Sequence, residues 1–255
     1  MPPKNIWTLL GSQPIILKPN LSESDPPDNF VGQNRRFFEV LGPFEIDGKG
    51  EVLVAWIRTI SFVASSGKLR QLYERITGQG NNVDNIMMLH SLRPNTMEGH
   101  MALYKFVLHH TGNTLPKWFL EAIGTYVSYL NKCDYCFEHH FVGLMRDLKN
   151  DERAHAIREA ITTEQVDMAP LSMREIAALK YARKLTITPA RMIENDVKQL
   201  RAAGFDDGQI LEINQVTAYF SYANRTVLGL GCNLEGDIIG LSPSNSEDPD
   251  DWSHQ

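Results

Sequence analysis

The sequence predicts an all-α fold for most of the chain, behind a loop-rich N-terminal extension. Apolar residues recur at helical spacing in one segment after another, from about residue 69 to residue 227. Proline, capping residues and glycine stand at the ends of several of these segments, where helices start and stop. Short β-like runs at 15–17 and 52–54 are too few to build a sheet.

The extension comprises residues 1–50. We interpret it as a segment that wraps the body of the protein or a neighbouring subunit, and partial disorder is the alternative. This interpretation depends on the turn-forming residues that interrupt the segment, which are Pro14, Pro19, Pro26, Pro27, Pro43, Gly42, Gly48 and Gly50.

The first predicted helices lie between residues 69 and 130. An apolar stripe over residues 69–76 stops at Gly78. Pro94 suits the first position of a second helix, which the pattern extends to Gly112. A third helix starts at Pro116 and continues to residue 130.

The helical pattern breaks at Asn131 and Lys132 and resumes over residues 137–148. A helix that begins at this break has residues 133–136 in its first turns. We expect the helical domain to cover residues 51–240, with a catalytic core at about 115–231. Residues 241–255 are expected to form a polar, loose tail.

Capping signals predict three later helix starts, at Ser172–Glu175, Thr188–Pro189 and Asp206–Gln209. The first is a capping box, and the second is a cap followed by proline at the first helical position. The helix after the third start is the last long one, and it ends at Gly229 and Gly231.

Composition limits the classes of function. The chain has 255 residues, 42% of them hydrophobic, and a formal net charge of −6. An acidic balance without a dense run of Lys and Arg argues against nucleic-acid binding. No stretch approaches the roughly 20 apolar residues of a membrane span. The first residues lead into no long apolar run, so no secretory signal is expected. We expect a cytoplasmic location.

Cys133, Cys136 and His140 form the most informative motif. Successive residues of a helix advance by about 100°, so these three side chains fall within a narrow arc. His139 points further round, which makes His140 the better base. In the first turns of a helix the macrodipole and free N–H groups favour a thiolate. The motif therefore predicts a dithiol whose thiolate is formed by a neighbouring imidazole.

The motif has two other interpretations. A thioredoxin domain places its CxxC after a strand, and no strand is predicted before Cys133. A Cys2His2 zinc site is possible with Cys133, Cys136, His139 and His140. However, adjacent histidines on one helix diverge by about 100°, and structural zinc usually takes its second pair of ligands from a separate segment. The third cysteine, Cys232, has no near partner in sequence and is expected to be a spectator.

A family resemblance rests on Thr114–Lys117, Glu121, Asn131–Cys136, His140 and Ala218–Arg225. With these residues the chain resembles the AhpD-like members of the carboxymuconolactone decarboxylase superfamily, in the branch described as alkylhydroperoxidase-like or peroxidase-related. The resemblance covers about residues 115–231. The spacing of Glu, CxxC and His together is specific, whereas CxxC alone is not.

The resemblance implies an all-helical fold and thiol-dependent reduction of hydroperoxides without haem, flavin or another cofactor. By the family's pattern, Cys136 is the peroxidatic thiolate, Cys133 the resolving thiol, His140 the base and Glu121 its relay partner. It also implies a homo-oligomer (dimer, trimer or hexamer) and an external dithiol reductant, lipoyl- or thioredoxin-like. General thiol–disulfide exchange and a structural metal-binding interaction module are the alternatives.

The sequence departs from the family at two positions. Some members have a histidine between the two cysteines, where this chain has Tyr135. A glycine is common just before the first cysteine, where this chain has Lys132. A cation at that position is expected to lower the pKa of a nearby thiol.

Overall fold

The computed structural model describes residues 53–77, 82–243, 247–248 and 251–254. The predicted extension over residues 1–50 lies outside them. Within the described residues the protein is helical and forms no strand, apart from an isolated antiparallel bridge between Pro243 and His254. The prediction of an all-α fold is confirmed. In the same part of the chain, no helix is long and apolar enough to cross a membrane.

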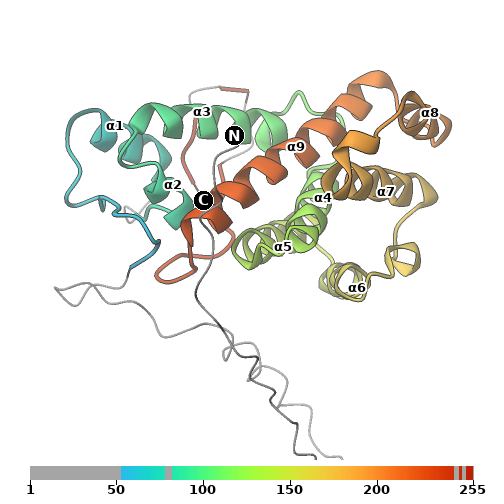
Figure 1. Cartoon of the computed structure of the whole chain (residues 1–255), viewed down its shortest axis with the longest axis horizontal. Coiled ribbons are helices and arrows are strands. Elements are labelled where there is room, and N and C mark those ends of the chain that lie inside the picture. Colours follow the sequence, from blue (N-terminus) through green and yellow to red (C-terminus); the bar gives the residue numbers. More distant parts are fainter. Residues whose placement is uncertain (1–52, 78–81, 244–246, 249–250, 255) are drawn as a thin grey trace, which may run out of the picture. The chain divides into compact units, whose positions relative to one another are not determined.

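Three helices lie at one end of this part of the chain (Figure 1): α1 (Gly67–Ile76), α2 (Asn85–Leu89) and α3 (Pro94–Tyr104). Pro94 occupies the first turn of α3, as predicted. The prediction of one continuous helix to Gly112 is wrong, because residues Lys105–His109 form a single π-helical turn. The wider turn brings the buried ring of His109 edge-on against Tyr104, at 4.7 Å between centroids.

The centre is built from α4 (Lys117–Leu130), α5 (Asp134–Leu148) and the long α9 (Asp207–Leu230). α4 packs most extensively against α5 and also contacts α9 and α7. Gly124 permits the close approach of α4 to α9, since a Cβ there would lie 2.2 Å from the ring of Phe220. α9 ends at Gly231, whose left-handed φ of 63° suits the residue that terminates a helix.

At the other end lie α6 (Asp151–Thr162), α7 (Met173–Ile187) and α8 (Glu194–Ala202) (Figure 1). The capping box predicted at the start of α7 is present, and the helix start predicted at Asp206 is confirmed and is also a capping box. The helix start predicted at Pro189 is wrong, because only one 3-10 turn follows, over Pro189–Arg191. α8 begins later, where an Asp196 carboxylate oxygen accepts the backbone N–H of Ile193 at 2.8 Å.

The C-terminal segment is packed, so the prediction of a loose tail is wrong for its described residues. Trp252 and His254 are 5% and 6% exposed, and the backbone N–H of His254 donates to the carbonyl of Ile76 at 3.0 Å. The guanidinium of Arg75 lies 3.8 Å from the ring centroid of Trp252. Figure 1 shows the red segment after α9 turning back toward α2 and α3.

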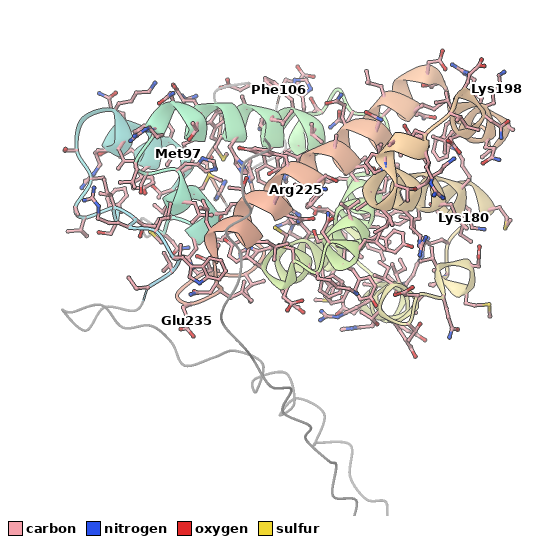
Figure 2. All side chains as sticks on the ribbon, viewed as in Figure 1. Met97, Phe106, Lys180, Lys198, Arg225 and Glu235 are labelled. Carbon is pink, nitrogen blue, oxygen red and sulfur yellow. The ribbon has the colours of Figure 1, made fainter. Side chains whose placement is uncertain are left out.

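The buried apolar side chains form one large cluster that extends across the helices, and a smaller one around the cysteines. Met97, labelled in Figure 2, is a fully buried member of the large cluster, near α1, α2 and α3. Glu235, also labelled there, lies in the loop after α9 and is exposed. The smaller cluster consists of Cys133, Tyr135, Cys136 and Val227. The two cysteines are therefore part of the packed interior.

Candidate active site

The turn between α4 and α5 positions the cysteines. The backbone N–H of Lys132 donates to Tyr129 O at 3.0 Å, and that of Cys133 to Ser128 O at 2.9 Å. Lys132 has a left-handed φ of 59°, a conformation that glycine adopts without strain. Cys133 is the N-cap residue of α5, and Cys136 is the third residue inside the helix. The cysteines thus lie in the first turn, as expected.

The two thiols are free, buried and hydrogen-bonded to each other. The hydrogen bond with Cys136 lowers the pKa of Cys133 below its ordinary value. The hydrogen bond with Cys133, together with burial, raises the pKa of Cys136 well above its ordinary value. Because one proton lies between two sulfurs, the pair loses its first proton more readily and its second less readily than two separate thiols would.

Lys132 is not the group that shifts these thiols. Its Nζ lies 4.3 Å from the ring centroid of Tyr129, in a cation–π contact. The hydrogen bonds that lower the pKa of Cys133 come from Cys136 and Asn224. The expected effect of a cation at position 132 is therefore not found.

Glu121 and His140 form a buried pair across α4 and α5. His140 Nδ1 lies 2.7 Å from Glu121 Oε2, and Glu121 is 1% exposed. Gly143 provides the space for this carboxylate, since a Cβ at that position would lie 2.9 Å from the carboxyl carbon. The ring of His140 packs edge-on against Phe220 at 4.4 Å between centroids. With Nδ1 occupied by Glu121, Nε2 is the nitrogen of His140 left to act as a base.

No hydrogen bond joins His140 to either sulfur among the described residues. Proton transfer from Cys136 to His140 therefore requires a water molecule or the substrate itself between them. Both side chains line one cavity, so such a molecule has a place to bind. The resemblance implied that Glu121 acts on His140 through water, whereas in this structure the carboxylate contacts the imidazole directly, at 2.7 Å.

His139 and Tyr135 belong to a separate cluster around Asp237, in the loop after α9. The hydroxyl of Tyr135 donates to Asp237 Oδ2 at 2.6 Å, and His139 Nε2 lies 3.5 Å from the same oxygen. His139 Nδ1 accepts the backbone N–H of Gly240 at 3.3 Å. Asp237 Oδ1 accepts the N–H of Asn85 at 2.9 Å. Tyr135 thus joins α5 to the C-terminal segment.

The two adjacent histidines contact different carboxylates, Asp237 for His139 and Glu121 for His140. They do not converge on one position, which a Cys2His2 site would require. In the described ranges no group of three or more His, Cys, Asp or Glu side chains is arranged to hold a metal ion.

Asn224 on α9 is a site residue that was not singled out from the sequence. It is fully buried, and its Oδ1 accepts from Asn131 Nδ2 at 2.9 Å. Its Nδ2 donates to Ser128 Oγ at 3.1 Å. An amide nitrogen carries two hydrogens, so one remains for the sulfurs. Hydrogen bonding from Asn224 lowers the pKa of both Cys133 and Cys136.

The cavity beside Cys136 has a volume of about 30 Å³. A water molecule needs roughly 10–15 Å³ on this measure, so the space accepts about two oxygen-sized atoms. The side chains that line it include Cys136, His140, Glu121 and Tyr135. Cys133 does not line it. The remaining wall includes polar side chains that sequence reasoning missed or set aside: Asp84, His100, Tyr104, His139, Arg146, Tyr219, Ser242 and His254. No local spacing relates them to the CxxC motif.

The fold matches solved structures of AhpD-like proteins. An uncharacterised peroxidase-related protein with an alkylhydroperoxidase AhpD core, from Ralstonia eutropha JMP134, superimposes with a TM-score of 0.63 at 22% identity, over 72% of this chain and 93% of that one. A peroxidase-related protein from Silicibacter sp. TM1040 gives a TM-score of 0.60 at 22% identity, over 75% and 95%.

A third match is the debrominase Bmp8, solved with 2,3,4-tribromopyrrole as a variant with one cysteine replaced by alanine. It has a TM-score of 0.56 at 18% identity, over 73% of this chain and 93% of that one. No protein-family model and no curated protein sequence matches the chain. The structural matches show that this protein has the AhpD-like helical fold, as the resemblance implied.

Proposed function

We propose that this protein is a thiol-dependent hydroperoxide reductase that uses Cys136 and Cys133. One observation carries the proposal: Cys136 and the Glu121–His140 pair line the same small cavity, with Cys133 hydrogen-bonded to Cys136. A nucleophile, a base oriented by a carboxylate and a second thiol are the groups that this reaction needs.

The first half of the cycle oxidises Cys136. His140 takes the thiol proton through a water molecule, and the thiolate attacks the distal oxygen of the hydroperoxide. The O–O bond breaks, its electron pair leaves with the proximal oxygen, and that oxygen is protonated to an alcohol. Cys136 becomes a sulfenic acid.

In the second half the Cys133 thiolate attacks the Cys136 sulfur, and the hydroxyl group leaves as water after protonation. The product is a Cys133–Cys136 disulfide. An external dithiol, lipoyl- or thioredoxin-like, reduces it by exchange and restores both thiols. We propose that this exchange takes place in a homo-oligomer.

The need for a thiolate sets the size of the pKa shift that the site has to provide. A free cysteine with a pKa near 8.5 is only a few per cent ionised at neutral pH. Lowering that value by about two units makes the thiolate the major form, at about 2.7 kcal/mol of stabilisation. The hydrogen bonds of the cysteine pair and of Asn224 act in this direction on Cys133. The pKa of Cys136 is raised by its hydrogen bond with Cys133 and by burial, so the attacking thiolate depends on proton removal by His140.

Burial of the thiols favours peroxide over disulfide substrates. Cys133 and Cys136 are 1% and 2% exposed, so a protein disulfide, like the external dithiol that completes the cycle, reaches the sulfurs only after a rearrangement. The cavity of about 30 Å³ accepts the two oxygens of a peroxide group. The small cavity therefore favours a hydroperoxide over a disulfide as the oxidising substrate.

Stopped-flow oxidation of the reduced protein tests the proposal. A panel of hydroperoxides, small disulfides and a brominated pyrrole should show the fastest loss of thiols with a hydroperoxide. One equivalent should remove two of the three titratable thiols per chain, and peptide mapping should find Cys133 joined to Cys136. An intermolecular disulfide through Cys232, or faster reaction with the disulfide or the pyrrole, would reject it.

A further inference from the structure

The cavity beside Cys136 has a second carboxylate–imidazole pair on its wall. His254 Nδ1 lies 3.1 Å from Asp84 Oδ2, and both side chains are buried. Asp84 precedes α2 and His254 lies in the C-terminal segment, so 170 positions of sequence separate them. Backbone contacts fix the position of His254, through the bridge to Pro243 and the hydrogen bond to Ile76.

This second pair has the same arrangement as Glu121 and His140. In each pair a carboxylate contacts Nδ1, which leaves Nε2 of the imidazole for another partner. His254 Nε2 is buried and has no hydrogen-bond partner within the described part of the chain. A buried polar atom without a partner is costly, and a ligand in the cavity that both histidines line would satisfy it.

The other imidazoles on this wall are less suited to carry a proton. His100 is fully buried, and desolvation followed by its neighbours His90 and His254 lowers its pKa to about 3, so it stays neutral. His139 Nδ1 accepts a backbone N–H instead of contacting a carboxylate, and its Nε2 lies 3.5 Å from Asp237 Oδ2. Of His100, His139 and His254, only His254 combines an Nδ1 contact to a carboxylate with an Nε2 that has no hydrogen-bond partner in the described part of the chain.

Reduction of a hydroperoxide needs an acid as well as a base. The thiolate displaces an alkoxide or hydroxide, which is a strongly basic leaving group unless it is protonated as the O–O bond breaks. Positioned acids of this kind contribute roughly 10²–10⁴-fold to reaction rates. His140 is assigned to the thiol proton, and His254 is a second imidazole on the same cavity that can serve the leaving oxygen.

We propose that His254, held by Asp84, is the general acid that protonates the leaving oxygen of the hydroperoxide. This inference rests on the proposed function. As the Cys136 thiolate bonds to the distal oxygen, the O–O electron pair passes to the proximal oxygen, which takes the proton from His254 Nε2. The proton that His140 removed from Cys136 returns through water to His254. The balance is one thiol and one hydroperoxide converted to one sulfenic acid and one alcohol.

The effect of the leaving group on the rate of Cys136 oxidation tests this role. An alkyl hydroperoxide releases a basic alkoxide, whereas a peroxycarboxylic acid releases a carboxylate that needs no proton at neutral pH. We expect His254→Gln to slow single-turnover oxidation of Cys136 by tert-butyl hydroperoxide by about 10²-fold, and oxidation by peracetic acid by less than about threefold. Asp84→Asn should show the same selectivity with a smaller loss.

His155→Gln on the exposed side of α6 is the matched control and should react like the parent with both oxidants. Equal losses with both oxidants in the His254 and Asp84 variants would mean that the pair only supports the fold, and would overturn the inference. Unchanged rates with both oxidants would also overturn it. A parent protein that no hydroperoxide oxidises would instead overturn the proposed function itself.

Discussion

The carboxylate of Glu121 on α4 reaches Nδ1 of His140 on α5 at 2.7 Å because residue 143, one turn after His140, is glycine. Any larger residue at that position would place its Cβ within 2.9 Å of the carboxyl carbon. The contact joins the two helices that pack most extensively on each other. It also fixes the tautomer and the orientation of the only base candidate that the sequence motif contains.

Replacing Gly143 with alanine should displace the Glu121 carboxylate. We expect the free energy of unfolding to fall by about 1–3 kcal/mol, as for other overpacked sites, with a matching loss of peroxide reduction. Denaturant unfolding and single-turnover oxidation measure the two effects. Gly99→Ala in α3 is the control, since its Cβ would meet nothing within 4 Å, and it should be neutral or stabilising by up to about 1 kcal/mol. A Gly143 variant as stable and active as the Gly99 variant would contradict this packing.

The two cysteines should behave differently when each is replaced by serine. Cys136→Ser should abolish the sulfenic acid, because Cys136 is the sulfur that lines the cavity. Cys133→Ser should let the sulfenic acid accumulate, because no thiol resolves it. Trapping with a sulfenate-specific reagent distinguishes the two. The test also bears on which sulfur attacks, since the hydrogen bond between the thiols lowers the pKa of Cys133 and raises that of Cys136. Sulfenic acid on Cys133 in the Cys136→Ser variant would reverse the order of attack.

The base relay should be visible in the pH dependence of alkylation. If His140 takes the proton of Cys136, His140→Gln should raise the pH midpoint of thiolate alkylation toward the value of a free cysteine. Glu121→Gln should raise it less, because its effect passes through the imidazole. Some lowering should persist in both variants, because the start of α5 itself favours a thiolate. A profile for His140→Gln that overlays the parent's would remove His140 and Glu121 from the mechanism.

Asn224 should act as a hydrogen-bond donor to the thiol pair. Its hydrogen bond lowers the pKa of Cys133 and Cys136, so removing the donor should move the alkylation midpoint to higher pH. Asn224→Asp has the same shape, keeps an acceptor for Asn131 and places a negative charge beside the sulfurs. We expect a rise of about one pH unit or more, measured by alkylation of the reduced protein.

Asn214→Asp is the control on the same helix, because its amide contacts the hydroxyl of Tyr181 and not the cysteines. It should leave the alkylation midpoint in place. Equal shifts in the Asn224 and Asn214 variants would mean that charge anywhere on α9 is sufficient, and that no specific hydrogen bond is involved.

Local patterns in the sequence determined most of the helices and the CxxC–His motif. The apolar stripes of α4 and α9 and the helix starts of α7 and α9 depend on residues a few positions apart, so their spacing alone predicts them. The motif from Cys133 to His140 is also local, because one helix carries it. Glu121 was predicted only through the family spacing, since an isolated glutamate on a helix has no distinguishing pattern.

Tertiary structure decided the rest of the site. The site includes residues that lie about 90 to 120 positions further along the chain than the cysteines, namely Asn224, Asp237 and His254. No periodicity in the sequence connects such distant residues. The burial of the tail was equally unpredictable, because Trp252 and His254 form no periodic pattern and make contacts with distant residues, among them Arg75 of α1 and Asp84. The π-helical turn depends on the packing of His109 against Tyr104. Short-range spacing determines which helices form, whereas the partners of buried polar groups are determined only when those helices pack together.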